Sequence, residues 1–367
     1  MKSFVNGYLE NAVIPLELTS DLRALGEFKG KQDLFGKQTP QVLETLRHIA
    51  MIQSTESSNR IEGITVDVKR LEPLIDKKTT PKDRPEAEVV GYRNVLAKIH
   101  ASSDSFEINP ETILQMHKEM LKGTNLPSGE WKRRDNTIEE KQSDGTWKTR
   151  FEPVTAVQTP YFMKTLCDEF NREWNKERAD RIILILSFVL DFLCIHPFTD
   201  GNGRISRLLT VLLLHKSGYD VGRYISLEKL IEDSKETYYE ILRDCSMGWH
   251  EGKHRILPWW RYSIGILISA YKEFMSRAGD VGSARGAKTD WIMEAIDNLG
   301  NSFTLAQIMK VCPGVSRPMI RVVVEKLRKK GVLKTLGTGR NAKWQKNVII
   351  SDKRDNKRDN KKKKPKK

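Results

Sequence analysis

Hydrophobic and polar residues alternate with helical spacing over most of the first 280 residues. Residues 1 to about 95 look mainly helical, since apolar positions recur three and four residues apart in segments such as 40–53 and 86–99. The same spacing predicts another amphipathic helix over 108–120. Comparable patterns predict further helices over 156–177, 180–195, 204–217, 236–247 and 258–277. The pattern therefore predicts a mainly α fold.

One segment between these helices has a different texture. Residues 127–153 are polar, and Asp144-Gly145 lies there between two short runs of extended character. An Asp-Gly pair between two such runs is a strong signal for a β-hairpin. We predict a short hairpin over about 134–153.

A second, smaller pattern follows a glycine-containing stretch at 276–288, which we interpret as a linker. It predicts a helix over 290–299, a short helix over 304–309, a turn at 312–314, a longer helix over 317–330 and a hairpin over 331–344 with Gly337 and Gly339 at its tip. This order is typical of a winged helix. The expected plan is a helical region (1–100), a core (101–275), the linker (276–288), a winged-helix-like domain (289–348) and a basic tail (349–367).

Positive charge is concentrated in the C-terminal part of a chain whose net charge is +15. The last 16 residues hold ten Lys or Arg against three Asp and no apolar residue, a composition that predicts disorder and attracts phosphate polyanions. In the predicted helix over 317–330, we expect Val322, Val323 and Leu327 to face the core. Basic residues occupy the remainder of that helix and the wing: Arg317, Arg321, Lys326, Arg328, Lys329, Lys330, Lys334, Arg340 and Lys343. DNA binding, a protein-interaction role and a merely solvated face all fit this pattern.

Several classes of protein are disfavoured. The four cysteines have no metal-ligand spacing, which argues against a zinc site or a disulfide framework. The most apolar run, 182–195, has 14 residues and contains Asp191, whereas a bilayer span needs about 20 apolar residues. The N-terminus lacks an apolar export signal. We expect a cytoplasmic protein without a membrane partner.

The strongest chemical signal is the stretch HPFTDGNGRISR, from His196 to Arg207. Glycines at a helix start allow backbone N–H groups to approach an anion, which the helix dipole also favours. Arg204 and Arg207 are three residues apart, so they would share a face and form a phosphate clamp. Asp200 suits Mg²⁺, which binds one or two carboxylates plus phosphate oxygens. His196 has the ordinary pKa of a general base near neutrality.

This stretch resembles the signature of the Fic family, H-x-F-x-(D/E)-G-N-G-R-x-x-R, at every defined position. Upstream, the sequence from Ser58 to Gly63 (SNRIEG) is similar to the family's inhibitory pattern, (S/T)-x-x-x-E-(G/N), although such spacing also occurs in helix caps. The resemblance covers about residues 1–275. It implies a Fic-type helical core, a hairpin flap and an autoinhibited class with an N-terminal inhibitory helix.

The resemblance also implies an activity, protein AMPylation, in which AMP passes from ATP to a Tyr, Ser or Thr hydroxyl of a target protein or of the enzyme itself. His196 would deprotonate the hydroxyl and Asp200 would hold Mg²⁺. Glu62, with Ser58, would hold Arg207 when the enzyme is off. The phosphates would be bound by Gly201, Asn202, Gly203, Arg204 and Arg207.

Other implications are less specific. Tyr238 and Tyr239 resemble an adenine-pocket segment, but Ser246 stands where relatives often have Asn, and a core role for both tyrosines is an equal alternative. The flap would pair with the target as an added strand, unless it is an ordinary surface hairpin. Alternatives for the whole chain are a DNA-binding regulator with a nucleotide-sensing core, or removal of AMP in the same pocket. The sequence leaves open whether the chain forms a homo-oligomer.

Overall fold

The computed structural model describes residues 2–347, except 6, 39, 142–145, 280–288, 290–291, 294, 297–298, 300, 313–314 and 338–341. The chain forms two compact units, Met1–Gly279 and Asp280–Lys367. Several predicted features lie outside the described residues: the Asp144-Gly145 turn, most of the linker, part of the helix over 290–299, part of the turn at 312–314, Gly339, Arg340 and the basic tail.

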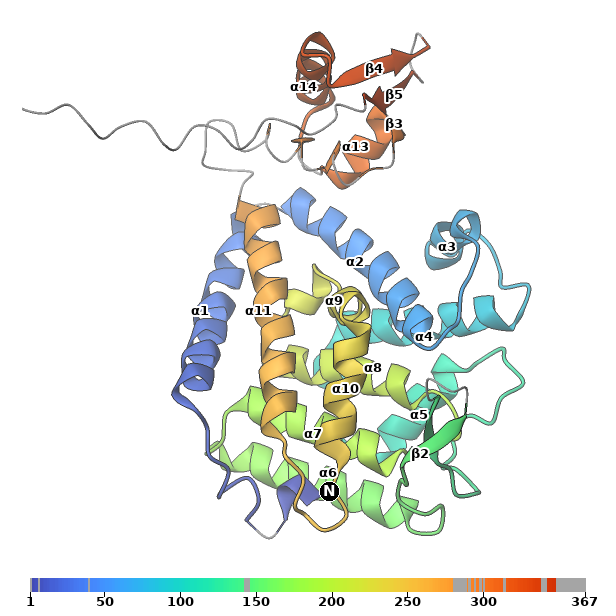
Figure 1. Cartoon of the computed structure of the whole chain (residues 1–367), viewed down its shortest axis with the longest axis vertical. Helices are drawn as coiled ribbons and strands as arrows, with labels where there is room; N and C mark the ends of the chain where they lie inside the picture. The colour runs from blue at the N-terminus through green and yellow to red at the C-terminus, as the bar shows by residue number, and fades with distance from the viewer. Residues whose placement is uncertain are drawn as a thin grey trace, which may run out of the picture. The chain divides into compact units, whose positions relative to one another are not determined.

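The first unit is built almost wholly of helices, which confirms the mainly α fold class (Figure 1). Within the described ranges, every helix is too short or too polar to cross a bilayer. The helical segments are η1 (Lys2–Phe4), α1 (Leu16–Gln38), α2 (Pro40–Ile61), α3 (Val68–Ile75), α4 (Arg84–Ser102), η2 (Ser103–Ser105), α5 (Pro110–Met120), α6 (Thr159–Lys176), α7 (Arg181–Ile195), α8 (Asn202–Lys216), η3 (Val221–Arg223), α9 (Leu227–Asp233), α10 (Lys235–Ser246) and α11 (Leu257–Gly279).

Helix α7 forms the centre of this unit and is buried from Ile182 to Ile195. It packs against α6, α8, α10 and α11, so apolar side chains are needed all around it (Figure 1). Its one acidic residue, Asp191, accepts hydrogen bonds from the Ser3 backbone N–H (3.0 Å) and the Trp249 indole N–H (2.6 Å). The carboxylate in this apolar helix is therefore compensated by donors from η1 and from the loop between α10 and α11.

The predicted hairpin is present as β1 (Ile138–Lys141) and β2 (Trp147–Phe151), which pair antiparallel. Ile138 is opposite Phe151, and the register shifts after Ile138. Helix α8 begins at Asn202, two residues before the expected start at Arg204, because the Gly201 backbone is left-handed and the helix follows it directly.

The second unit contains a three-stranded antiparallel sheet in the order β3-β5-β4, with two described helices. Its elements are β3 (Ser302–Thr304), α13 (Leu305–Val311), α14 (Arg317–Lys329), β4 (Leu333–Leu336) and β5 (Lys343–Lys346). The short strand β3 was not predicted; it ends at Thr304, which caps α13 in a capping box with Gln307. The winged-helix assignment stays a prediction.

The prediction for Val322 was wrong. Its side chain is 66% exposed, while Ile320, Val323 and Val324 are buried. On α14 the positions 320, 323, 324 and 327 form the stripe that faces the core, and residue 322 falls outside that stripe. Leu327, as predicted, packs against the core.

Candidate active site

The loop between α7 and α8 is held in an unusual backbone conformation. His196 ends α7 with a left-handed φ of 50°, and its backbone N–H donates to Phe192 O at 3.0 Å. Asn202 ties the loop together: its Oδ1 accepts from the Phe198 backbone N–H (2.9 Å) and its Nδ2 donates to Phe198 O (2.8 Å). The side chain of Asn202 thus holds the loop in shape through these two bonds. The groups that the loop has left for binding an anion are its backbone N–H groups.

The glycines at the amino end of α8 allow other groups to approach the helix backbone closely. Among the described residues, no side chain caps this helix. Gly201 has φ 84°, and a Cβ there would lie 2.7 Å from Cε of Met120. A Cβ on Gly203 would lie 2.3 Å from Oε1 of Glu62, so glycine is required for the carboxylate to reach the helix end. A negative group therefore already stands at this helix end.

Arg207 holds that carboxylate. Its Nη2 donates to Glu62 Oε1 (2.7 Å) and to Ser58 O (2.9 Å), and its Nε donates to Ser58 Oγ (2.8 Å). The Arg207 side chain is 4% exposed and that of Glu62 is 29% exposed. Burial lowers the pKa of Arg207, but the Glu62 carboxylate, together with Tyr238 and Tyr92, outweighs burial and raises the pKa above its ordinary value. The three residues predicted as a switch therefore lie in direct contact.

Arg204 has different partners. Its Nη1 pairs with the buried carboxylate of Glu88, and its Nη2 donates to Asp200 Oδ1 at 3.2 Å. Arg84 completes a ring of four charges by donating to Glu88 (2.7 Å) and approaching Asp200 Oδ2 (3.5 Å). Arg204 and Arg207 thus do not form one clamp in this state, because each guanidinium is directed at its own carboxylate.

Asp200 fits a metal that binds only together with a phosphate. Its side chain is 44% exposed, and Oδ1 also accepts from the Gly201 backbone N–H (2.5 Å). Within the described chain there is no cluster of three His, Cys, Asp or Glu that could hold a metal ion. A single accessible carboxylate beside a phosphate site is nevertheless the usual protein contribution to a Mg²⁺ site.

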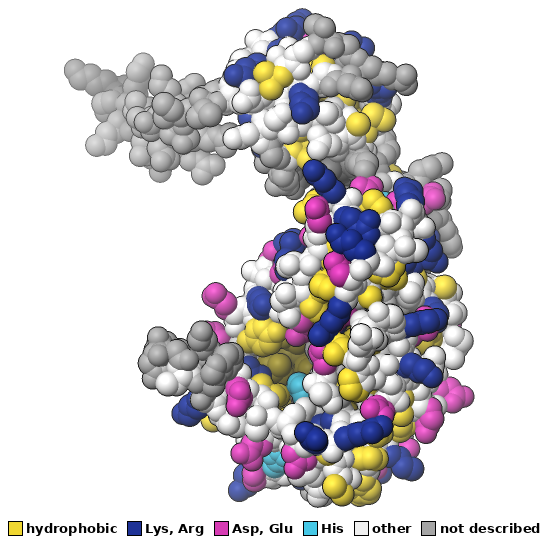
Figure 2. Space-filling view, turned by 90° about the vertical axis from the view of Figure 1, so that its right-hand side faces the viewer, with side chains coloured by type: hydrophobic (Ala, Val, Ile, Leu, Met, Phe, Trp, Pro, Cys, Tyr) yellow, Lys and Arg dark blue, Asp and Glu magenta, His cyan; other side chains and the backbone are white. Residues whose placement is uncertain are grey.

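His196, Gly203, Arg207 and Glu62 line a pocket of about 200 Å³, together with the predicted tyrosines and residues of both hairpin strands. Asp200 and Arg204 are not among its lining residues. Apolar side chains gather around a hollow on the face drawn in Figure 2. Tyr238 is buried and Tyr239 half-buried. The lining residues are Glu62, Ile138, Arg150, Phe151, Leu193, Cys194, His196, Gly203, Arg207, Tyr238, Tyr239, Leu242 and Ser246.

His196 is neutral in this pocket at physiological pH. Burial lowers its pKa to about 4, the positive charges of Lys132 and Arg150 act in the same direction, and the Leu193 carbonyl and Glu62 oppose them. A neutral imidazole is the form that accepts a proton.

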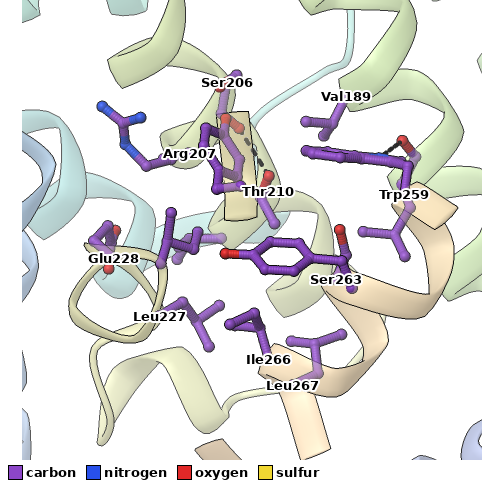
Figure 3. A pocket seen from close by; sticks show the side chains of 15 residues that line it. Val189, Ser206, Arg207, Thr210, Leu227, Glu228, Trp259, Ser263, Ile266 and Leu267 are labelled. Carbon is purple, nitrogen blue, oxygen red and sulfur yellow. Dashed lines mark hydrogen bonds between the residues drawn. The ribbon is translucent and has the colours of Figure 1, made fainter. Parts of the chain in front are cut away.

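A second, smaller cavity of about 40 Å³ also has Arg207 and Tyr238 in its lining. Figure 3 shows this cavity. Apolar side chains such as Val189, Leu227 and Ile266 line it, and the Arg207 guanidinium points away from it. A space this small and apolar has no room for a nucleotide. We interpret it as a packing defect behind the switch arginine.

Three residues that support the site could not be recognised in the sequence. His117 donates from Nε2 to Asp200 O (3.0 Å), stacks on Phe198 with ring centroids 3.7 Å apart and is buried. Glu88 holds Arg204, and Lys132 bonds the loop around His196. All three lie 60 or more residues before the motif, so only the fold brings them to it.

The comparisons with known proteins agree with this geometry. The Fic/DOC family model matches residues 107–214. A probable protein adenylyltransferase of Aquifex aeolicus is 24% identical over 191 residues, covering 50% of this chain and 53% of that protein. The protein adenylyltransferase fic-1 of Caenorhabditis elegans is 27% identical over 165 residues, covering 43% and 30%. The chain thus matches about half or less of the length of these curated relatives.

The fold is also that of a solved relative. The crystal structure of a Fic family protein from Desulfovibrio desulfuricans superposes with a TM-score of 0.59 at 20% identity, covering 93% of this chain and 99% of that one. The sequence match contains the whole stretch from His196 to Arg207, together with α7 and nearly all of α8. The match to the Fic/DOC family model therefore identifies residues 107–214 of this chain as a Fic domain.

Proposed function

We propose that this protein is an adenylyltransferase that moves AMP from ATP to a hydroxyl of a protein. The observation that carries the proposal is the pocket in which His196, Gly203, Arg207 and Glu62 meet at the amino end of α8. Relatives named as protein adenylyltransferases support the same reaction class.

In this mechanism the chain binds the triphosphate with the backbone of residues 201–203 and with Arg207. His196 takes the proton of the target hydroxyl, whose oxygen attacks the α-phosphorus while the bond to pyrophosphate breaks. The donors at the α8 end stabilise the charge that develops on the phosphate. A bound polyphosphate near His196 would raise the pKa of the imidazole from about 4 and make it a stronger base.

Asp200 would hold Mg²⁺, which supplies neutralisation of phosphate charge when it is bound. Arg204 and Glu88 would keep the Asp200 carboxylate in place, since both belong to the same ring of charges. Arg84 would have to give up its long 3.5 Å contact with Asp200. That contact is exposed and long, so its loss costs little.

Glu62 would keep the enzyme off. A carboxylate and a terminal phosphate cannot both occupy the Arg207 guanidinium, and the support for this competition is the 2.7 Å ion pair together with the bond to Ser58. In the off state ATP would bind only in an unproductive position.

The β1–β2 hairpin would present the target, because Ile138, Arg150 and Phe151 line the pocket and the strands form a two-stranded sheet. A target segment that adds as a further strand would bring a Tyr, Ser or Thr hydroxyl towards His196. Tyr238, Tyr239 and Ser246 line the same pocket and are the proposed adenine contacts. Hydroxyls of the enzyme itself are a second acceptor.

The test uses ATP labelled at the α- or the γ-phosphate, with magnesium and the Glu62→Gly protein. We expect label on protein only from the α position, with much less from the unaltered chain and none from Glu62→Gly, His196→Ala. Label from the γ position would instead indicate phosphorylation. Loss of label on long incubation without added pyrophosphate would reveal the alternative, removal of AMP in the same pocket.

A second function, DNA binding, is favoured by the surface of α14. A groove of about 1320 Å³ lies between this helix and the β4–β5 hairpin, and it is lined by Arg317, Arg321 and Lys329. Of the basic groove residues described, Arg328 pairs with Glu325, whereas Arg321 has no ion pair in the described part of the chain. Several positive charges on an exposed helix attract a phosphate backbone.

The test is a salt-dependent gel shift with duplex DNA and the full chain. Arg321→Gln with Lys329→Gln should weaken binding and reduce the salt slope by about two, since each of the two side chains would neutralise one phosphate. Arg172→Gln, on α6 of the other unit, is the matched control. Absence of binding at low salt would dismiss this function and leave the transferase proposal untouched.

A further inference from the structure

Lys132 is a buried lysine next to the catalytic loop. It lies in the segment between α5 and β1, and its residue is 3% exposed. Its Nζ donates to Ile195 O (3.3 Å) and to Asn136 Oδ1 (2.7 Å), and its backbone N–H donates to Pro197 O (2.9 Å). Lys132 therefore bonds the carbonyl groups on both sides of His196.

The same segment also contacts Phe198, which follows Pro197 in the loop. Asn136, which accepts from Lys132, donates from Nδ2 to Phe198 O at 3.3 Å, and the Trp131 ring lies 5.3 Å from the Phe198 ring. A left-handed φ such as that of His196 costs energy in a residue with a Cβ, so the surrounding contacts must impose it. Lys132 supplies two of those contacts.

The charge of Lys132 is placed where it acts on both the helix and the histidine. Ile195 is the last residue of α7, so an ammonium group at its carbonyl complements the negative end of the helix dipole. Burial lowers the pKa of Lys132 to about 8, and the Asp135 carboxylate opposes this shift. Because this pKa is still above 7, Lys132 is mainly protonated near neutrality. After burial, its positive charge is the largest influence that lowers the pKa of His196.

We propose that Lys132 is a positioning residue for the transfer reaction: it fixes the backbone of His196 through the Ile195 and Pro197 carbonyls and holds one positive charge near the imidazole. This inference rests on the proposed function. The other charged groups that face His196 are Glu62, which directly follows α2, and Arg150 from β2. Both remain unchanged in the first part of the test, the titration of His196.

The consequence is a pH effect with a definite sign. A positive neighbour disfavours the imidazolium, so removing it raises the pKa of His196 and the base becomes protonated at higher pH. The acid limb of kcat/KM should move upwards by about one pH unit, which is about a ten-fold lower rate on the acid side of the limb. If Lys132 contributed only to folding, its removal would lower stability and leave the acid limb of the kcat/KM profile at the same pH.

The first part of the experiment is an NMR titration of ¹⁵N-labelled histidines in the full chain, comparing Lys132→Gln and Lys132→Met with the unaltered protein. Lys164→Gln is the control, because Lys164 is 70% exposed on α6. The His196 signal is assigned by its loss in His196→Ala. The second part measures the pH profile of kcat/KM for the same variants in the Glu62→Gly background. We expect both Lys132 variants, and not the control, to raise the His196 pKa and to shift the limb.

An unchanged His196 titration in folded Lys132→Gln and Lys132→Met proteins would overturn the proposal. The titration needs no catalysis. If the Glu62→Gly protein transfers no AMP while the His196 pKa still rises in the Lys132 variants, the proposed function fails and the influence of Lys132 on the histidine stands.

Discussion

The Glu62 carboxylate occupies the space beside Gly203 that any larger residue would need, with Oε1 only 2.3 Å from the position of a Cβ there. The same oxygen is 2.7 Å from Nη2 of Arg207. One carboxylate thus lies beside the amino end of α8 and also pairs with the Arg207 guanidinium. A phosphate that binds at either place has to displace it.

Ser58→Ala should release the switch only in part. It removes the bond from Arg207 Nε to Ser58 Oγ but keeps the Glu62 ion pair and the bond to the Ser58 carbonyl. A hydrogen bond to a charged group contributes about 1.5–3 kcal/mol, so we expect transfer about ten- to a hundred-fold above the unaltered chain. Initial rates of AMP transfer for Ser58→Ala and Glu62→Gly provide the measurement. If Ser58→Ala raised the transfer rate as much as Glu62→Gly does, the expectation that Glu62 restrains Arg207 more strongly than Ser58 Oγ would be contradicted.

Gly203→Ala should displace Glu62 without activating the enzyme. The added methyl group collides with the carboxylate, but it also fills the place that the phosphates need. We expect weaker ATP binding than in Glu62→Gly, measured by calorimetry, and no gain in transfer rate. The double variant Glu62→Gly, Gly203→Ala is the control, because the methyl group can then act only on the nucleotide. Tight ATP binding by the double variant would show that phosphate does not approach residue 203.

Contacts from α9 and α10 hold the end of α2 that carries Glu62. Glu232 accepts from Arg60 Nη2 (3.0 Å), and Lys235 Nζ donates to Ile61 O (2.6 Å). Glu232→Gln weakens a bidentate pair that is partly exposed, so we expect basal transfer to rise about two- to five-fold, a free-energy change of about 1 kcal/mol or less. Asp233→Asn is the matched control, since it breaks an exposed pair with Lys229 and leaves the Arg60–Glu232 pair in place, acting on Arg60 through its charge alone. Equal rates for both variants would show that this contact does not restrain the switch.

Acid should destabilise the fold through buried histidines. Burial lowers the pKa of His100 to about 3 and those of His117 and His196 to about 4. Between those values and the ordinary pKa of about 6.5, the unfolded chain binds protons that the folded chain excludes, so stability is present above pH 6.5 and falls as the pH drops.

Over this pH range, each such histidine lowers the free energy of unfolding by at most about 1.4 kcal/mol for each pH unit of acidification. Urea unfolding at several pH values between 7 and 4.5 measures the slope. His100→Gln, which lies outside the candidate site, should make the slope shallower. A free energy of unfolding that does not change with pH, or that rises on acidification, would contradict the assignment of neutral buried histidines.

Much of the fold could be predicted from the sequence because most helices have one apolar stripe or are apolar throughout. The stretch before His196 is buried over its whole length, and its apolar run predicted a buried helix. Helix α9 is only seven residues long and was missed, since so short an element does not show a periodic pattern. Val322 was misplaced because neighbouring valines on α14 look alike until the stripe around residue 320 is known.

Several residues that the sequence predicted for a site lie together in the structure, while their functional roles stay predictions. The partners that hold these residues could not be predicted. His196, Asp200 and Arg207 lie within twelve residues, and a resemblance to a known pattern was enough to add Ser58 and Glu62. That Arg204 is directed at Glu88 could not be foreseen, because 116 residues separate them. Buried polar groups of this kind are paired by the fold and leave no local pattern.

The intact mass of the Glu62→Gly protein after incubation with ATP and magnesium tests the central claim most directly, with Glu62→Gly, His196→Ala treated in parallel. We expect a gain of one or more adenylate groups on the first protein, or on an added target, and none with the second. An unchanged mass of protein and targets in the first, or an equal gain in both, would contradict a transferase that uses His196 and is restrained by Glu62.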